Sequence, residues 1–126
     1  MRDTGLWPVI VRGPGGPVPV LGLLRDAMRT EKALHIEYAD EGGKSSERDI
    51  WPVQLGYYEG KQIVVAWCCL RTAFRNFRTD RVVAASPTEN RFARRRSVLA
   101  REWQDEWDRI HPDWAAERRK DAAERG

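Results

Sequence analysis

The sequence predicts a mainly β protein with helices at both ends, which is an α+β fold. Apolar residues recur at intervals of three and four between residues 20 and 34, as expected of an amphipathic helix. Short segments with period-two alternation follow, separated by turns that contain glycine, as in an antiparallel sheet. A helical period returns after residue 90. The 126 residues suffice for one domain and hardly for two.

Three regions differ in composition. Residues 1–20 hold four prolines and four glycines, so we expect an extended arm or linker there, not a folded element. The apolar residues Trp7 and Val9 to Val11 indicate that part of this arm packs on the domain or on another segment. Residues 21–90 are expected to form the domain, and residues 91–126 a C-terminal helical extension.

The strands are predicted from period and turn residues. Residues 33–39 alternate as a half-buried strand, and the following turn contains two glycines that can adopt positive φ. Residues 47–59 resume as a strand in which Pro52 predicts an edge or a bend. The run at residues 62–70 is the most apolar of the chain, and its β-branched content favours a central strand.

The stretch "LRTAFRNFRTDRV" concentrates positive charge. On a helix its arginines would share one face, but its residues are poor helix formers and "VVAAS" follows. We therefore expect a turn near residues 72–74 and a strand from Arg75 to Ala85, which Pro87 ends. The stretch interleaves four arginines with two phenylalanines: Arg71, Phe74, Arg75, Phe77, Arg78 and Arg81.

The charge distribution indicates an anionic partner. Residues 71–101 contain nine arginines against two carboxylates, a local charge of +7, whereas residues 102–126 have a local charge of −3. Arginine makes bidentate contacts to phosphate and stays charged, and a neighbouring phenylalanine offers a face on which a base can stack. The run Arg94–Arg96 is interpreted either as a solvated face or as a further nucleic-acid contact.

The C-terminal region is expected to be helical. Residues 91–110 carry an apolar stripe, His111-Pro112 interrupts it, and Asp113 can cap a last, mostly polar helix. The two central tryptophans should pack on the domain or on a second subunit, which favours a homodimer. The stripe consists of Val98, Leu99, Trp103, Trp107 and Ile110.

The remaining residues point to a reduced, cytoplasmic protein. Cys68 and Cys69 are adjacent and are not expected to bond to each other, and at least one should be buried. Neither they nor His35 and His111 show metal-ligand spacing, so we expect no metal and no cofactor. No signal peptide and no apolar run long enough for a membrane span is seen.

Four segments of the chain carry a resemblance to a known family: Ile36–Tyr38, Ser46–Leu55, Val65–Arg71 and Arg75–Val82. Together they resemble the WYL domain, a bacterial regulatory module usually fused to a helix-turn-helix DNA-binding domain. The resemblance extends from about Leu21 to Ser86, and its most specific part is the spacing of arginine, phenylalanine, arginine, aspartate and arginine. The chain departs from the family at the eponymous tripeptide, where it has Gln62-Ile63-Val64, and at Cys69, where a histidine is common.

The resemblance implies a small Sm-like or SH3-like β-barrel at residues 21–90, preceded by a helix. It also implies an arginine-lined groove for an oligonucleotide or nucleotide effector, such as single-stranded DNA or RNA. Because residues 1–20 cannot form a helix-turn-helix, a DNA-binding protein would act in trans, or the chain is a piece of a longer regulator. The ligand-binding residues implied are Tyr38, Ser46, Arg71, Arg75, Phe77, Arg78 and Arg81.

Two other functions remain open from the sequence. The arginines could serve folding and dimer contacts only, as in a protein-interaction domain. A small ribonuclease-like toxin would use the arginines for phosphate and His35 as base, although His35 beside Glu37 fits a structural histidine better. No catalytic residue is expected, because no Ser/His/Asp, Cys/His or paired-carboxylate arrangement has a suitable context. The chain is therefore expected not to be an enzyme.

Overall fold

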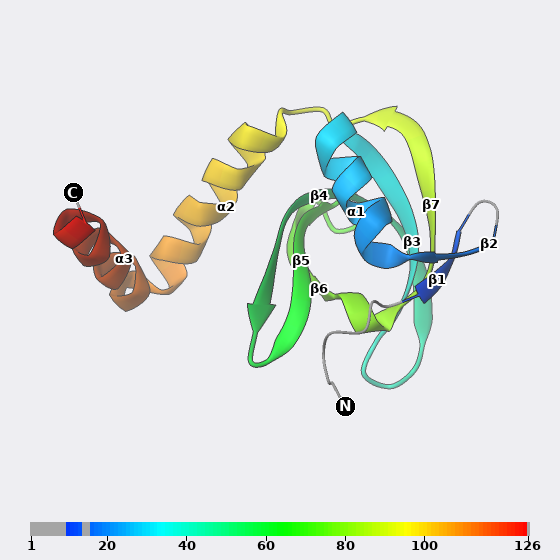
Figure 1. Ribbon diagram of the computed structural model, residues 1–126, viewed down its shortest axis with the longest axis horizontal. Helices are drawn as coiled ribbons and strands as arrows, with labels where there is room; N and C mark the ends of the chain where they lie inside the picture. Colours follow the sequence, from blue (N-terminus) through cyan, green and yellow to red (C-terminus); the bar gives the residue numbers. More distant parts are fainter. Residues whose placement is uncertain (1–9, 14–15, 126) are drawn as a thin grey trace.

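The computed structural model describes residues 10–13 and 16–125, which form one sheet and three helices (Figure 1). The expected mixture of strands and helices is confirmed. In chain order the elements are β1 (Ile10–Gly13), β2 (Gly16–Pro19), α1 (Val20–Thr30), β3 (Lys32–Ala39), β4 (Ser45–Tyr58), β5 (Lys61–Cys68), β6 (Ala73–Arg78), the 3-10 helix η1 (Thr79–Arg81), β7 (Val82–Arg91), α2 (Arg96–Ile110) and α3 (Pro112–Arg125). Among the described helices, none is long and apolar enough to cross a membrane.

The strands lie in the order β2-β1-β7-β3-β4-β5-β6. Strands β7, β3, β4, β5 and β6 pair antiparallel, and β1 joins β7 through one parallel pair, Arg12 with Ala84. The ladders between described residues leave β2 and β6 as the two edges, so the sheet is open.

The five antiparallel strands are nevertheless strongly curved. Strands β6 and β7 lie at opposite ends of this set, yet only the three residues of η1 connect them. Five strands in a flat sheet would place the outer two about 19 Å apart, at roughly 4.8 Å per strand. A 3-10 turn of this length advances the chain by only about 8 Å. The short connection therefore requires the sheet to curl so that its ends approach each other.

The sheet has a core on each face. On one face α1 contributes Leu24, which packs with Ile36 of β3 and Val64 of β5. On the other face Leu99 of α2 packs with Val65 of β5. The neighbours Val64 and Val65 enter different cores because successive side chains of a strand point to opposite faces. Strand β5 pairs on both sides and is thus interior, as its apolar run predicted.

The N-terminal prolines and glycines do not prevent regular structure. Strands β1 and β2 pair as an antiparallel hairpin, and Val11 is buried in the first core. The expectation that residues 1–20 contain no folded element is wrong for this hairpin, whereas part of the arm does pack on the domain. The two prolines of β2 are tolerated because this strand lies at the edge of the sheet, where one side of the strand needs no backbone hydrogen-bond donor. Trp7 and Val9 lie outside the described residues.

The single strand expected from Arg75 to Ala85 is wrong, because η1 divides it into β6 and β7. Thr79 in η1 is almost fully buried, and its hydroxyl donates to the side-chain oxygen of Gln62 at 3.0 Å. Nor does Pro87 end β7, which continues to Arg91. Pro87 pairs with Leu34 beside a register shift, an irregular position at which a missing donor is tolerated.

The helix limits differ from the periodic pattern. Helix α1 ends at Thr30, where Glu31 adopts a left-handed conformation with φ of 56°. Helix α2 begins only at Arg96, because the chain remains in β7 as far as Arg91. Phe92 then packs on Trp51, with ring centroids 5.8 Å apart. The predicted stripe of α2 is confirmed at Leu99, but its members Val98 and Ile110 are exposed.

Candidate anion-binding site

A cavity of about 470 Å³ lies between the β3–β4 turn and strand β6. It brings together six of the seven residues implied as ligand-binding. They come from β3, β4, β6, the loop before β6, and η1, so the site depends on the curvature of the sheet. We name it the arginine cavity; the residues of interest that line it are Tyr38, Ser46, Arg48, Arg71, Arg75, Phe77 and Arg81.

The arginine cavity carries excess positive charge. Its lining holds four arginines and Lys44 against the carboxylates of Asp40 and Glu41. Among the described residues, the structure gives no ion-pair partner to Arg71, Arg75 or Arg81. Arginines without a carboxylate partner can make charge-assisted bonds to an incoming anion without first breaking a contact.

Arg48 belongs to this group, although it is not among the residues that the family resemblance implied. Its Nε donates to Ser46 Oγ at 3.1 Å, and its guanidinium carbon lies 5.8 Å from the centre of the Phe77 ring. These contacts orient its side chain toward the cavity. Arg48 is two residues from Ser46 in β4 and therefore shares its face, so the period-two pattern could have identified it.

Phe77 does not have the exposed face that base stacking requires. It is 2% exposed, and its ring makes a T-shaped contact with the Tyr38 ring, with centroids 5.0 Å apart. The stacking role expected of Phe77 is therefore wrong. It fails because Phe77 points into the first core, where it supports Tyr38 and Arg48 from beneath.

Arg78 lies outside the lining of the arginine cavity. Its guanidinium makes a bidentate pair with Asp80, at 3.0 Å from Nε and 2.7 Å from the second nitrogen. This pair lowers the pKa of Asp80 below its ordinary value. The backbone N–H of Arg78 donates to the Tyr38 hydroxyl at 2.9 Å, which joins the end of β6 to β3. Arg78 thus stabilises the turn at η1, and Tyr38 has a structural contact of its own.

His35 also lies outside the arginine cavity. Its Nδ1 is 2.7 Å from Asp49 and its Nε2 is 2.8 Å from Glu47, both across the β3–β4 ladder. Hydrogen bonds to Glu47 and then to Asp49 raise the pKa of His35 above its ordinary value. A base at this position does not face the phosphate groups that the arginines would bind.

The two cysteines are free, as expected, and Cys68 is buried in the first core. Cys69 is partly buried, and this burial raises the pKa of its thiol. A raised pKa disfavours the reactive thiolate. The cysteines therefore serve packing in this fold.

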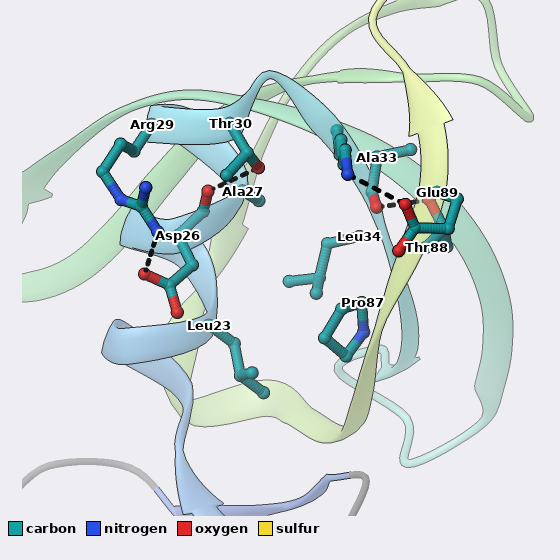
Figure 2. Close-up of a pocket in the computed structure, with 11 residues that line it drawn as sticks. Leu23, Asp26, Ala27, Arg29, Thr30, Ala33, Leu34, Pro87, Thr88 and Glu89 are labelled. Carbon is teal, nitrogen blue, oxygen red and sulfur yellow. Dashed lines mark hydrogen bonds and ion pairs between the residues drawn. The ribbon is translucent and has the colours of Figure 1, made fainter.

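A second cavity, of about 240 Å³, lies between α1 and the strands β3 and β7 (Figure 2). Its rim carries charges, but they are paired with one another. Asp26 pairs with Arg29 at 3.3 Å, and Lys32 pairs with Glu89 at 2.8 Å. This cavity lacks the excess charge that distinguishes the arginine cavity.

Comparison with known families identifies the class of this fold. The model of the WYL domain matches residues 19–87, which is more than half of the chain and includes every residue named for the arginine cavity. The chain belongs to the WYL domain family. This confirms the resemblance inferred from the arginine spacing. Family membership assigns the chain to a class of regulatory, ligand-sensing domains; helices α2 and α3 lie beyond the matched range.

Among solved structures, this WYL domain is similar to Proteasome accessory factor B/C (PafBC) of Arthrobacter aurescens. The TM-score is 0.55 and the sequence identity is 25%. The similarity covers 59% of this chain and 12% of the PafBC chain, so this chain matches only a small part of that protein. No curated protein matches the chain.

Proposed function

We propose that this WYL domain is a non-catalytic regulatory module whose arginine cavity binds the phosphate groups of a nucleic acid or nucleotide effector. The observation that carries the proposal is the convergence of Arg71, Arg75 and Arg81 on one cavity with no ion-pair partner among the described residues. A cytoplasmic chain of this kind would pass the effector's presence to a DNA-binding protein in trans or to further domains of a longer regulator.

The proposal extends to the type of fold. Family membership and the short η1 connection, which draws the ends of the five-stranded sheet together, support a Sm-like or SH3-like barrel. In such an arrangement, residues from β3, β4 and β6 surround one mouth of the barrel. This geometry favours a ligand that several strands contact at once.

Fluorescence anisotropy with a labelled (dT)8 strand tests the proposal. If Arg48, Arg71, Arg75 and Arg81 neutralise four phosphates, the slope of log affinity against log salt should be about −3. Affinity should then fall roughly fifty-fold between 50 and 200 mM salt. Arg71→Ala, Arg75→Ala and Arg81→Ala should each make the slope shallower by about 0.7.

Arg78→Ala is the matched control, since it removes an arginine of the same segment that lies outside the cavity. It should leave the slope unchanged and lower stability instead, because Asp80 loses its partner. The second candidate, a protein-interaction domain with structural arginines, predicts a different outcome. In that case no strand or nucleotide binds at low salt, and each of the four cavity arginines lowers the melting temperature when replaced.

A further inference from the structure

A third cavity, of about 180 Å³, lies where the β4–β5 hairpin meets helices α2 and α3. In Figure 1, α2 runs outward from the sheet and α3 forms the far end of the molecule. The cavity is bounded by aromatic rings from the hairpin and both helices, and by Asn76 of β6. We name it the aromatic cavity; its rings belong to Tyr57, Tyr58, Trp103, Trp107 and Trp114.

The rings are held in place and yet remain accessible. Trp107 is the centre of the group, with its ring centroid 5.6 Å from Trp103, 5.4 Å from Trp114 and 6.2 Å from Tyr58. Tyr57 is 70% exposed and Trp114 is 51% exposed. A flat ligand can therefore contact these rings, which it cannot do at the buried Phe77.

The aromatic cavity adjoins the arginine cavity. Asn76 lines both, and Arg75, the residue before it, lines the arginine cavity. Because β6 is an edge strand of the described sheet, no described strand pairs with its outer side and separates the two cavities there. A strand of nucleic acid bound by the arginines can thus continue over β6 to the rings.

The size and chemistry of the aromatic cavity fit a single ring system. A protein cavity of about 150 Å³ accommodates benzene, so 180 Å³ admits one flat ring but not a large ligand. None of the described side chains that line it is charged, and the amides of Gln54 and Asn76 supply donors and acceptors. Aromatic faces with a few amides match the faces and edges of a nucleobase.

We infer that the aromatic cavity receives an unpaired base of a single strand whose phosphates occupy the arginine cavity. This inference rests on the proposed function and adds a base-binding site built from the C-terminal helices. Stacking on aromatic side chains occurs with any base, so the site selects for single-strandedness rather than for sequence.

Binding of the full chain to two strands of equal length tests the inference. One strand is (dT)8, and the other is an abasic strand that keeps every phosphate and lacks the bases; (U)8 serves as the RNA equivalent. Wild type should prefer (dT)8 or (U)8 over the abasic strand by about 5- to 150-fold, the range for one stacked base. Tryptophan fluorescence should be quenched by the strands with bases only.

Trp114→Ala and Tyr57→Ala should each reduce this preference while the salt slope stays unchanged, because stacking releases no counterions. Ile110→Ala is the control, since it removes an exposed apolar side chain of α2 that does not line the aromatic cavity. Circular dichroism checks that each variant is folded.

The outcomes separate the two proposals. If neither the oligonucleotides with bases nor the abasic oligonucleotide binds, the proposed function fails and the base site fails with it. If strands bind with the expected salt slope but the abasic strand binds equally well, only the base site is overturned. Binding of a proline-rich peptide that Trp114→Ala abolishes, without any base dependence of strand binding, would also overturn it and assign the rings to a protein partner.

Discussion

Phe77 and Arg75 lie two residues apart on one face of β6, but only Phe77 is part of a core. We expect Phe77→Ala to lower the free energy of unfolding by about 3–5 kcal/mol, because it leaves a cavity under Tyr38 and Arg48. Phe77→Leu should lower the free energy of unfolding by less than Phe77→Ala does. Arg75→Ala should change it by no more than about 0.5 kcal/mol. Urea unfolding measures all three, and equal losses for Phe77→Ala and Arg75→Ala would refute this division of roles.

His35 predicts a pH dependence of stability. Its folded pKa lies above the ordinary value of 6.5, so the protonated ring contributes stability that is fully present below pH 6.5. This contribution is lost as the pH rises through the folded pKa. The side chain is 40% exposed, so the effect should stay below about 1 kcal/mol.

The measurement compares wild type with His35→Gln by urea unfolding at about pH 5.5 and pH 8.5. The stability advantage of wild type over the variant should be larger at the lower pH. An advantage that does not change with pH, or that grows at the higher pH, would show that the ring makes no net favourable interaction with Glu47 and Asp49.

The candidate site could be predicted from the sequence as a set of residues, but not as a set of roles. Charge density and spacing selected Arg71, Arg75 and Arg81 correctly as neighbours. They could not show that Arg78 has a different role from the other arginines, because its bidentate pair with Asp80 depends on the turn at η1. They missed Arg48, because it lies in a strand remote in sequence from the arginine-rich segment and meets it only through the curled sheet.

At the scale of elements, η1 determines the architecture. The Thr79 hydroxyl bonds Gln62 on β5 and is almost fully buried, so Thr79→Val should cost about 1–3 kcal/mol by leaving the Gln62 oxygen unpaired. Thr79→Ser keeps the hydroxyl and should recover most of this part of the loss. Thermal unfolding distinguishes the two; a valine variant more stable than the serine variant would mean that the side chain matters only through its methyl group.

Strands such as β3 were predictable because their period-two alternation reflects one buried and one more exposed face: Leu34 and Ile36 are buried, whereas His35 between them is partly exposed. The turn after β3 and the bend near Pro52 were predictable from glycine and proline, and β4 shows a register shift between Pro52 and Gln54. The turn is shorter than the predicted residues 40–46, because Ser45 and Ser46 already belong to β4. The break at η1 was not, since three residues carry no period and their conformation is fixed by contacts with β5. The β1–β2 hairpin was missed because its pairing partner β7 lies about seventy residues away.

At the scale of the whole molecule, the two cores should unfold together, since β4 and β5 belong to both. Leu99→Ala should lower the free energy of unfolding by about 2–5 kcal/mol. Val98→Ala, at an exposed neighbour on α2, is the control and should change it little. Circular dichroism at far-ultraviolet wavelengths and tryptophan fluorescence should report one shared transition. Two separate transitions would show that α2 and its core are an independent unit.

The edge position of β6 has a consequence for solubility. An edge strand exposes unpaired backbone groups along one side, and such groups can recruit a strand from another molecule and start aggregation. The sequence of β6, "AFRNFR", would otherwise suit such pairing, because it holds two aromatic residues in six. Its exposed polar residues, Arg75 and Asn76, make the edge a poor template. The positive charge proposed to bind a polyanion should therefore also disfavour edge-to-edge pairing between copies of the chain.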